Sequence, residues 1–139
     1  MKVYLLNALI TPFEADESEV AVFVISKISK DNFVEILRQA KENNIPIESA
    51  IGHQATVDFL KELVPEFSEV FVYNRSMIYL EEGDMGLVVR VAPRGERIRE
   101  YQLDELRDFY KKGEIEFIVV SRVYAPEVVF KPLGLPVVS

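Results

Sequence analysis

Short apolar blocks separated by polar stretches set the expected secondary structure of this 139-residue chain. Runs rich in β-branched and aromatic residues are typical of strands buried in a sheet. Such runs predict strands at residues 3–6, 20–25, 70–73, 77–80, 87–91 and 115–123, with an edge strand at 128–130. The run at 115–123 is the most apolar of these, which favours a central place in the sheet.

Apolar residues three and four positions apart predict three helices. The first lies between Ser29 and Asn43, the second lies between His53 and Pro65, and the third covers residues 103–112. Serine favours the N-cap position, because its hydroxyl accepts a hydrogen bond from a free amide of the first turn. Proline cannot continue a helix, and a glycine commonly follows the last turn.

The order of these elements points to a fold class. Strands and helices do not alternate strictly, which argues against a doubly wound parallel sheet. We therefore predict an α/β (α+β) fold with a mixed sheet of about five to seven strands, flanked by helices. The length fits a single domain, with residues 1–123 as its body and the proline-rich residues 124–139 as a C-terminal extension.

The charge balance narrows the class of ligand. Sixteen Lys and Arg against 23 Asp and Glu give a formal net charge of −7. This excess of acid argues against a general binder of long nucleic acid, which carries an excess of basic residues. An anionic ligand would have to be held by a local cluster of positive charge.

The composition also limits metals and location. The chain has no cysteine and one histidine, so disulfides and thiolate metal sites are excluded, and neither a metal nor a cofactor is expected. No apolar run approaches the roughly 20 residues of a membrane-spanning helix, so we expect no membrane partner. The N-terminal run predicts a strand and not a signal peptide, and the expected location is the cytoplasm.

The single histidine lies in the segment Ile-Gly-His-Gln-Ala-Thr, residues 51–56, where a loop opens the second helix. Gly52 has no Cβ, so the backbone can approach a ligand closely there. A helix N-terminus offers free amides and the positive end of the helix dipole, which favour an anion such as phosphate. An imidazole has an ordinary pKa of about 6.5, which suits general acid or base chemistry. His53 therefore indicates acid–base chemistry on a phosphodiester.

Other polar residues at strand ends are weaker candidates. Arg75 and Arg94 each follow an apolar strand, and guanidinium groups bind phosphate oxygens in a bidentate manner. Asn7 follows the first strand. Each has a plain structural alternative: His53 as a turn residue, the arginines as solvated surface charges, and Asn7 as a cap on a strand end.

The order and spacing of these residues resemble one family. The motifs that carry the resemblance are Tyr-Leu-Leu-Asn-Ala at 4–8, Ser-Ala-Ile-Gly-His-Gln-Ala-Thr at 49–56, Asn74-Arg75, Leu-Val-Val-Arg at 87–90, and Arg94. Together they are similar to the small viral anti-CRISPR ring nucleases of type III systems and their cellular and phage relatives. The resemblance runs from about residue 2 to about residue 120, so it implies that residues 1–123 are a ring-nuclease-like domain.

The resemblance implies a two-fold homodimer of mixed α/β subunits, with cyclic tetra-adenylate bound across the two-fold axis. It further implies metal-independent cleavage to linear di-adenylate with a 2′,3′-cyclic phosphate, which would switch off type III CRISPR signalling. His53 would be the general acid, and Arg94 would stabilise charge on the phosphoryl oxygens. The expected contacts to the ring and its phosphates are Asn7, Gly52, Thr56, Arg75 and Arg90.

The chain departs from the family pattern at two places. Viral members carry Arg-x-x-Glu with a catalytic glutamate, but the gapless register from Arg94 puts Arg97 at that position. Glu96, one residue away, is therefore the predicted catalytic carboxylate, and Arg97 is a predicted ligand contact. Glu100 restores the spacing only if Arg97 is the arginine of the motif, which breaks the gapless match that runs on into Leu103.

The second departure follows the first strand. The serine that family members carry a few residues after the asparagine falls at Ile10 in this chain, and Thr11 is one residue further on. Thr11 is therefore the predicted ligand contact in that loop. Two other functions stay open beside the enzyme: a cyclic-oligoadenylate sensor or sink with little turnover, favoured by the positive charge of Arg97, and a structural dimer without a nucleotide ligand.

Overall fold

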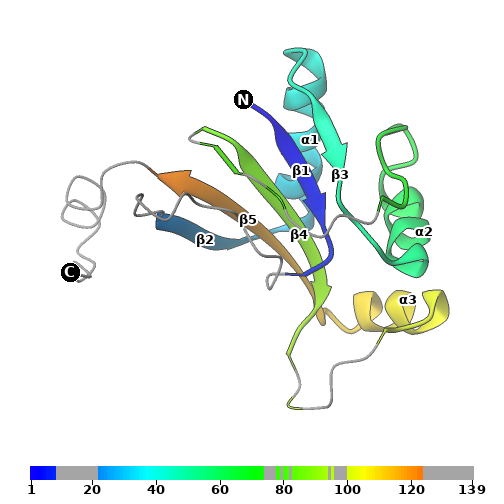
Figure 1. Cartoon of the computed structure of the whole chain (residues 1–139). Helices are drawn as coiled ribbons and strands as arrows, with labels where there is room; N and C mark the ends of the chain where they lie inside the picture. Colours follow the sequence, from blue (N-terminus) through cyan, green and yellow to red (C-terminus); the bar gives the residue numbers. More distant parts are fainter. Residues whose placement is uncertain are drawn as a thin grey trace.

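The computed structural model describes residues 1–8, 22–73, 78, 80–81, 83–93, 95 and 100–123 (Figure 1). In these ranges the chain forms five strands and three helices. In chain order they are β1 (Val3–Leu6), β2 (Val22–Ile28), α1 (Lys30–Glu42), β3 (Ile47–Ser49), α2 (Gln54–Leu63), β4 (Met85–Val91), α3 (Leu103–Lys111) and β5 (Ile115–Val123).

The five strands form one mixed sheet in the order β2-β5-β4-β1-β3. β1 runs parallel to both of its neighbours, β3 and β4. β5 runs antiparallel to β4 and β2. The carboxyl ends of β1, β3 and β4 therefore point in the same direction, as Figure 1 shows. The predicted mixed sheet in a single α+β domain is confirmed.

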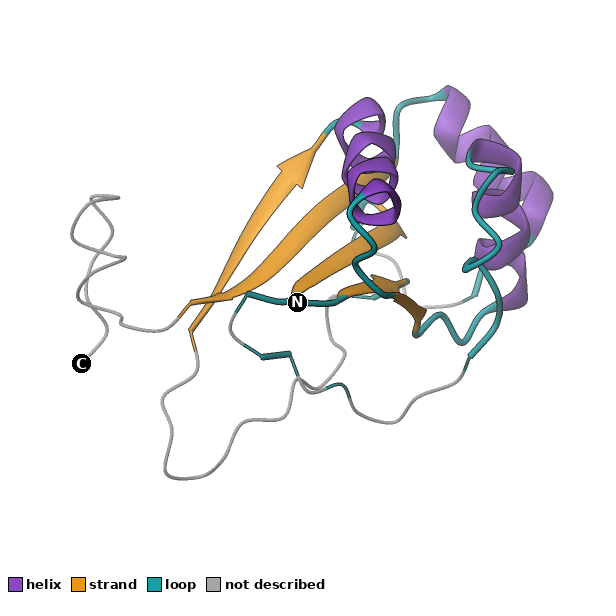
Figure 2. Ribbon diagram, turned by 90° about the horizontal axis from the view of Figure 1, so that it is seen from above, coloured by secondary structure: helices purple, strands orange, loops and turns teal. Residues whose placement is uncertain are grey.

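The three helices cover one face of the sheet (Figure 2). Phe33 and Leu37 of α1 are fully buried there, and Phe33 packs on Phe117 of β5 with 5.1 Å between ring centroids. Phe59 of α2 packs against Tyr110 of α3 in the same layer. Burying a side chain of this size contributes about 1.5–3 kcal/mol, so this layer supplies much of the stability.

The opposite face carries a second, smaller apolar cluster. Its buried members come from β1, β4, β5 and the chain between α2 and β4: Tyr4, Leu6, Ile78, Leu80, Val88, Ile118 and Val120. Asp84 holds the chain after Leu80 in place. Its carboxylate accepts hydrogen bonds from the backbone amides of Lys2 and Glu81, at 2.8 and 2.9 Å. The sheet is therefore apolar on both faces.

Local sequence signals explain where the helices begin and end. The hydroxyl of Ser29 accepts from the amide of Asn32 at 3.1 Å, which is the predicted N-cap. Before α3, the amide of Gln102 donates to the carboxylate of Glu105 at 3.1 Å. Gly113 follows α3 with φ of 73°, a conformation that glycine adopts without strain.

The strand predictions were less accurate than the helix predictions. β3 was missed, because only three residues pair and their apolar signal is weak. The predicted strand at 70–73 is wrong: it forms only an isolated bridge between Val72 and Ile51. β2 extends to Ile28, beyond the predicted end. The proposed edge strand at 128–130 lies outside the described residues.

Within the described ranges, none of the helices has the length and apolar content needed to cross a bilayer.

Candidate functional site

Two polar residues of the candidate site, Asn7 and His53, lie beyond the carboxyl ends of parallel strands. Asn7 directly follows β1 and is half-buried. The loop to His53 follows β3, the strand beside β1. In α/β sheets this edge commonly holds the ligand, because loops and helix N-termini converge there.

Hydrogen bonds from neighbouring segments hold the loop that carries His53. The amide of Ala50 donates to the carbonyl of Leu5 at 2.8 Å, which continues the pairing of β1 and β3. The hydroxyl of Ser49 donates to the carbonyl of Phe71. One residue past Ala50, the carbonyl of Ile51 accepts from the amide of Tyr73 at 3.0 Å. The backbone two residues before His53 is therefore fixed from both sides.

His53 occupies the N-cap position of α2, but its side chain does not cap the helix. Its Nδ1 lies 2.8 Å from the hydroxyl oxygen of Thr56, and its Nε2 lies 3.9 Å from a carboxylate oxygen of Glu100. The imidazole is 14% exposed. One ring nitrogen is thus hydrogen-bonded, and the other faces a carboxylate across a distance too long for a hydrogen bond.

The first turn of α2 leaves backbone donors for a ligand. The amide of Val57 donates to the carbonyl of His53 at 3.2 Å, as the helix requires. For the amides of Gln54, Ala55 and Thr56, no hydrogen bond is formed to any described part of the chain. The turn contains no acidic residue that would repel an anion. The helix N-terminus therefore has the free amides on which the prediction of an anion there depends.

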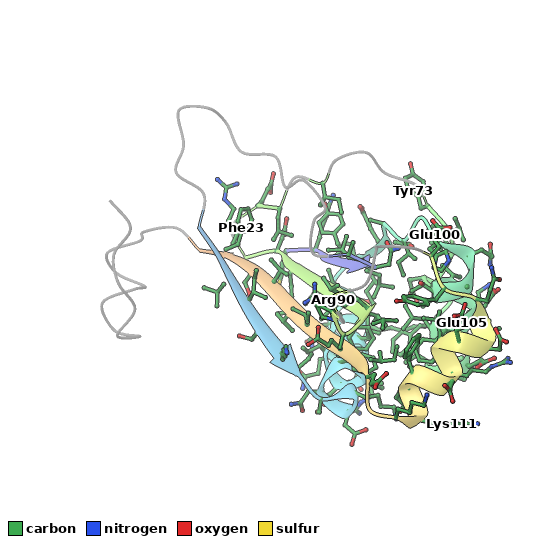
Figure 3. The ribbon with its side chains drawn as sticks, turned by 90° about the horizontal axis from the view of Figure 1, so that it is seen from below. Phe23, Tyr73, Arg90, Glu100, Glu105 and Lys111 are labelled. Carbon is green, nitrogen blue, oxygen red and sulfur yellow. The ribbon has the colours of Figure 1, made fainter. Side chains whose placement is uncertain are left out.

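Glu100 was not among the predicted site residues. It lies on the segment that enters α3 (Figure 3). Its side chain is 80% exposed, and a carboxylate oxygen lies 3.9 Å from Nε2 of His53. The sequence contained a signal for it, the spacing Arg97-x-x-Glu100, which was set aside because it breaks the gapless register. Its carboxylate is the one that this second register would place in the motif.

Arg90 is held in a different cluster. Its guanidinium donates to Glu116 on β5 at 3.0 Å, and Lys27 on β2 forms an ion pair with the same carboxylate at 2.5 Å. The hydrogen bonds from Lys27 and then Arg90 hold the pKa of Glu116 below its ordinary value. Figure 3 shows Arg90 on β4, apart from Glu100. The predicted ligand contact at Arg90 is thus already paired within the chain.

The remaining predicted residues divide into two groups. Gly52 is exposed beside His53, and Thr56 is buried beneath it. Five others lie outside the described residues: Thr11, Arg75, Arg94, Glu96 and Arg97. Across the described ranges, no group of three His, Asp or Glu side chains is arranged to hold a metal ion.

Comparisons with known proteins place the chain in a family. A family model described as STIV B116-like matches residues 3–117. The fold is similar to the solved structure of B116 of Sulfolobus turreted icosahedral virus, with a TM-score of 0.61 and 24% identity, covering 87% of this chain and 99% of that chain. A comparison with curated protein sequences gave no match. The chain belongs to the STIV B116-like family.

Proposed function

We propose that this member of the STIV B116-like family is a metal-independent ring nuclease. It would bind cyclic tetra-adenylate across a two-fold dimer axis and cleave it to linear di-adenylate, which would switch off type III CRISPR signalling. The observation that carries the proposal is the arrangement of His53 at the N-terminus of α2, with Nδ1 held by Thr56 and Nε2 facing Glu100. The family resemblance of the surrounding motifs supports cyclic tetra-adenylate as the substrate.

The reaction uses a nucleophile that RNA itself supplies. The ribose 2′-oxygen attacks the adjacent 3′-phosphorus and loses its proton to solvent, while the bond from phosphorus to the 5′-oxygen breaks. Nε2 of the His53 imidazolium gives its proton to the departing 5′-oxygen. The products are a 2′,3′-cyclic phosphate and a free 5′-hydroxyl. Cleavage of two opposite linkages converts the four-fold ring into two di-adenylates.

Binding and charge stabilisation fall to neighbouring groups. The free amides of the first turn of α2 would bind phosphate oxygens beside His53. Asn7 and Arg75 carry the roles that the family resemblance implies, and the arginine of the Arg-x-x-Glu motif stabilises negative charge on the phosphoryl oxygens. A two-fold dimer suits the ligand, because a four-fold ring presents equivalent phosphates to two equivalent sites.

Glu100 takes the role of the family glutamate in this proposal. Its carboxylate is 3.9 Å from Nε2, so it interacts favourably with the imidazolium without a hydrogen bond that would retain the proton. Arg97 then becomes the arginine of the Arg-x-x-Glu motif. This arrangement favours an enzyme over a sink, because a carboxylate accompanies the general acid despite the shifted register.

The test is incubation of the purified protein with cyclic tetra-adenylate in excess chelator, followed by chromatography of the products. We expect di-adenylate with a cyclic phosphate end. An intact ring that co-elutes with the protein would indicate a sensor or sink, and an intact ring that elutes separately would refute the nucleotide ligand. Sedimentation of the same sample gives the subunit number, for which we expect two.

A further inference from the structure

The hydroxyl of Thr56 forms a hydrogen bond within the protein, to the ring of His53. Thr56 is the third residue of α2 and is only 6% exposed. Within the described part of the chain, its hydroxyl has one hydrogen-bonding partner, Nδ1 of His53 at 2.8 Å. Residues three apart on a helix face the same side, so this contact is built into the first turn.

We propose that Thr56 is a positioning residue that holds the His53 ring, rather than a contact to the ligand. The hydroxyl fixes the ring orientation and occupies Nδ1, which leaves Nε2, the nitrogen that faces Glu100, for the proton used in catalysis. The catalytic consequence rests on the proposed function, whereas the positioning itself does not.

A hydroxyl suits this position because it can both donate and accept. When the ring is neutral, the Thr56 hydroxyl can donate to Nδ1, and the ring proton then lies on Nε2, where the nearby Glu100 carboxylate, a group that only accepts, favours it. When the ring is charged, the hydroxyl turns and accepts from Nδ1–H. A carbonyl or carboxylate at the same place could only accept, and would leave Nε2 without a proton in the neutral ring. Thr56 therefore allows both charge states without a movement of the imidazole.

The contact also keeps the helix amides available. At an ordinary N-cap, the side chain accepts a hydrogen bond from the backbone amide two or three residues on. His53 instead uses Nδ1 for the side chain of Thr56, and no cap hydrogen bond forms. The first-turn amides stay free for a phosphate, and Nε2 stays beside them. One hydrogen bond thus serves both the acid and the binding site.

The direct test uses the fact that the chain has a single histidine. The imidazole nitrogen signals in a long-range proton–nitrogen NMR spectrum therefore belong to His53 alone. At a pH where the ring is neutral, we expect a protonated Nε2 and an unprotonated Nδ1 in the wild type and in Thr56→Ser. Thr56→Val keeps the shape but removes the hydroxyl, and should give averaged signals from both tautomers.

A second measurement separates positioning from ligand contact. In the wild-type background, Thr56→Val should slow cleavage of cyclic tetra-adenylate about tenfold, while Thr56→Ser should stay within about threefold. In a His53→Ala background, Thr56→Val should leave the affinity for the ring unchanged, because the residue it positions is already absent. Thr56→Ala replaces the valine variant if the latter does not fold.

The inference is wrong if Thr56→Val leaves the imidazole spectrum as in the wild type, or if the wild-type neutral ring carries its proton on Nδ1. Weaker ring binding in the His53→Ala background would identify Thr56 as a ligand contact and would also overturn it. If the protein neither binds nor cleaves the ring, the proposed function fails, and the NMR spectra alone still decide the role of Thr56.

Discussion

Among the charged clusters of the described residues, two use their polar groups in opposite ways. On the strands, the Glu116 carboxylate is 10% exposed and pairs with both Arg90 and Lys27. Beyond the strand ends, His53 has one hydrogen-bonded nitrogen, and the nearby Glu100 carboxylate is 80% exposed at 3.9 Å. The first cluster is satisfied within the chain, whereas the first-turn amides of α2 beside His53 remain available to a ligand.

The difference separates a structural role from a functional one. Charges that are paired between neighbouring strands contribute to stability and have little capacity left for a ligand. A rigidly held imidazole with free backbone amides beside it contributes little to folding but is arranged for an anion. Substitutions in the strand-end cluster should therefore change catalysis, and substitutions in the Glu116 cluster should change stability.

The largest effect is expected at His53. His53→Ala removes the proposed general acid, which typically contributes about 10²- to 10⁴-fold, so the cleavage rate should fall by that factor. Affinity for cyclic tetra-adenylate should stay within about threefold, because a general acid acts mainly in the transition state. Single-turnover kinetics and a direct binding assay measure the two quantities. A variant that cleaves as fast as the wild type would remove His53 from the mechanism.

The next largest effect on the cleavage rate is expected at the carboxylate that assists His53, and it distinguishes Glu100 from Glu96. Glu100→Gln should slow cleavage about tenfold, because the imidazolium loses the charge at 3.9 Å from Nε2. Glu96→Gln is the matched control, with the same chemical change four residues earlier, and should slow cleavage less than twofold. The reverse result would restore the gapless register and make Glu96 the catalytic glutamate.

The sequence predicted the helices and the histidine because their signals are local. The hydroxyl of Ser29 caps α1 three residues from the amide that it binds, and the apolar stripe of each helix repeats within a few turns. His53 was found from the glycine and threonine around it, and its place at the start of α2 is confirmed. Both the helices and the position of His53 could be predicted from residues within a few positions along the sequence.

The features that were missed depend on distant parts of the chain. β3 exists because Ile47–Ser49 pairs with β1, more than 40 residues earlier in the chain. Arg90 pairs with Glu116 because the antiparallel register of β4 and β5 puts them directly opposite each other. Glu100 reaches His53 only through the tertiary placement of the segment before α3. No spacing along the sequence encodes the first two contacts, and the spacing Arg97-x-x-Glu100 points to Glu100 only in a register that breaks the gapless match.

A smaller effect, on stability alone, is expected from the Glu116 cluster. Glu116→Gln keeps the size of the side chain but removes its charge, which leaves Arg90 and Lys27 without their common partner. We expect the free energy of unfolding to fall by about 1 kcal/mol, because Lys27 is exposed and its charge can be solvated. The cleavage rate should change less than twofold. Urea unfolding gives the first quantity, and a large loss of activity in the folded variant would contradict the separation of the two clusters.

The smallest effect is the pH dependence of the difference in unfolding free energy between the wild type and Glu116→Gln. Lys27 and Arg90 lower the pKa of Glu116 in the folded protein, so the folded state binds fewer protons at this carboxyl than the unfolded state. The stabilisation is therefore complete above the unfolded value of about 4.5 and is lost as the pH falls through the lower, folded value. The stability advantage of the wild type over Glu116→Gln should stay constant from pH 7 to about pH 5.5 and shrink at lower pH. Other carboxylates are common to both proteins and cancel in the difference. An advantage that grows on acidification would show that the ion pairs do not hold Glu116 in its charged form.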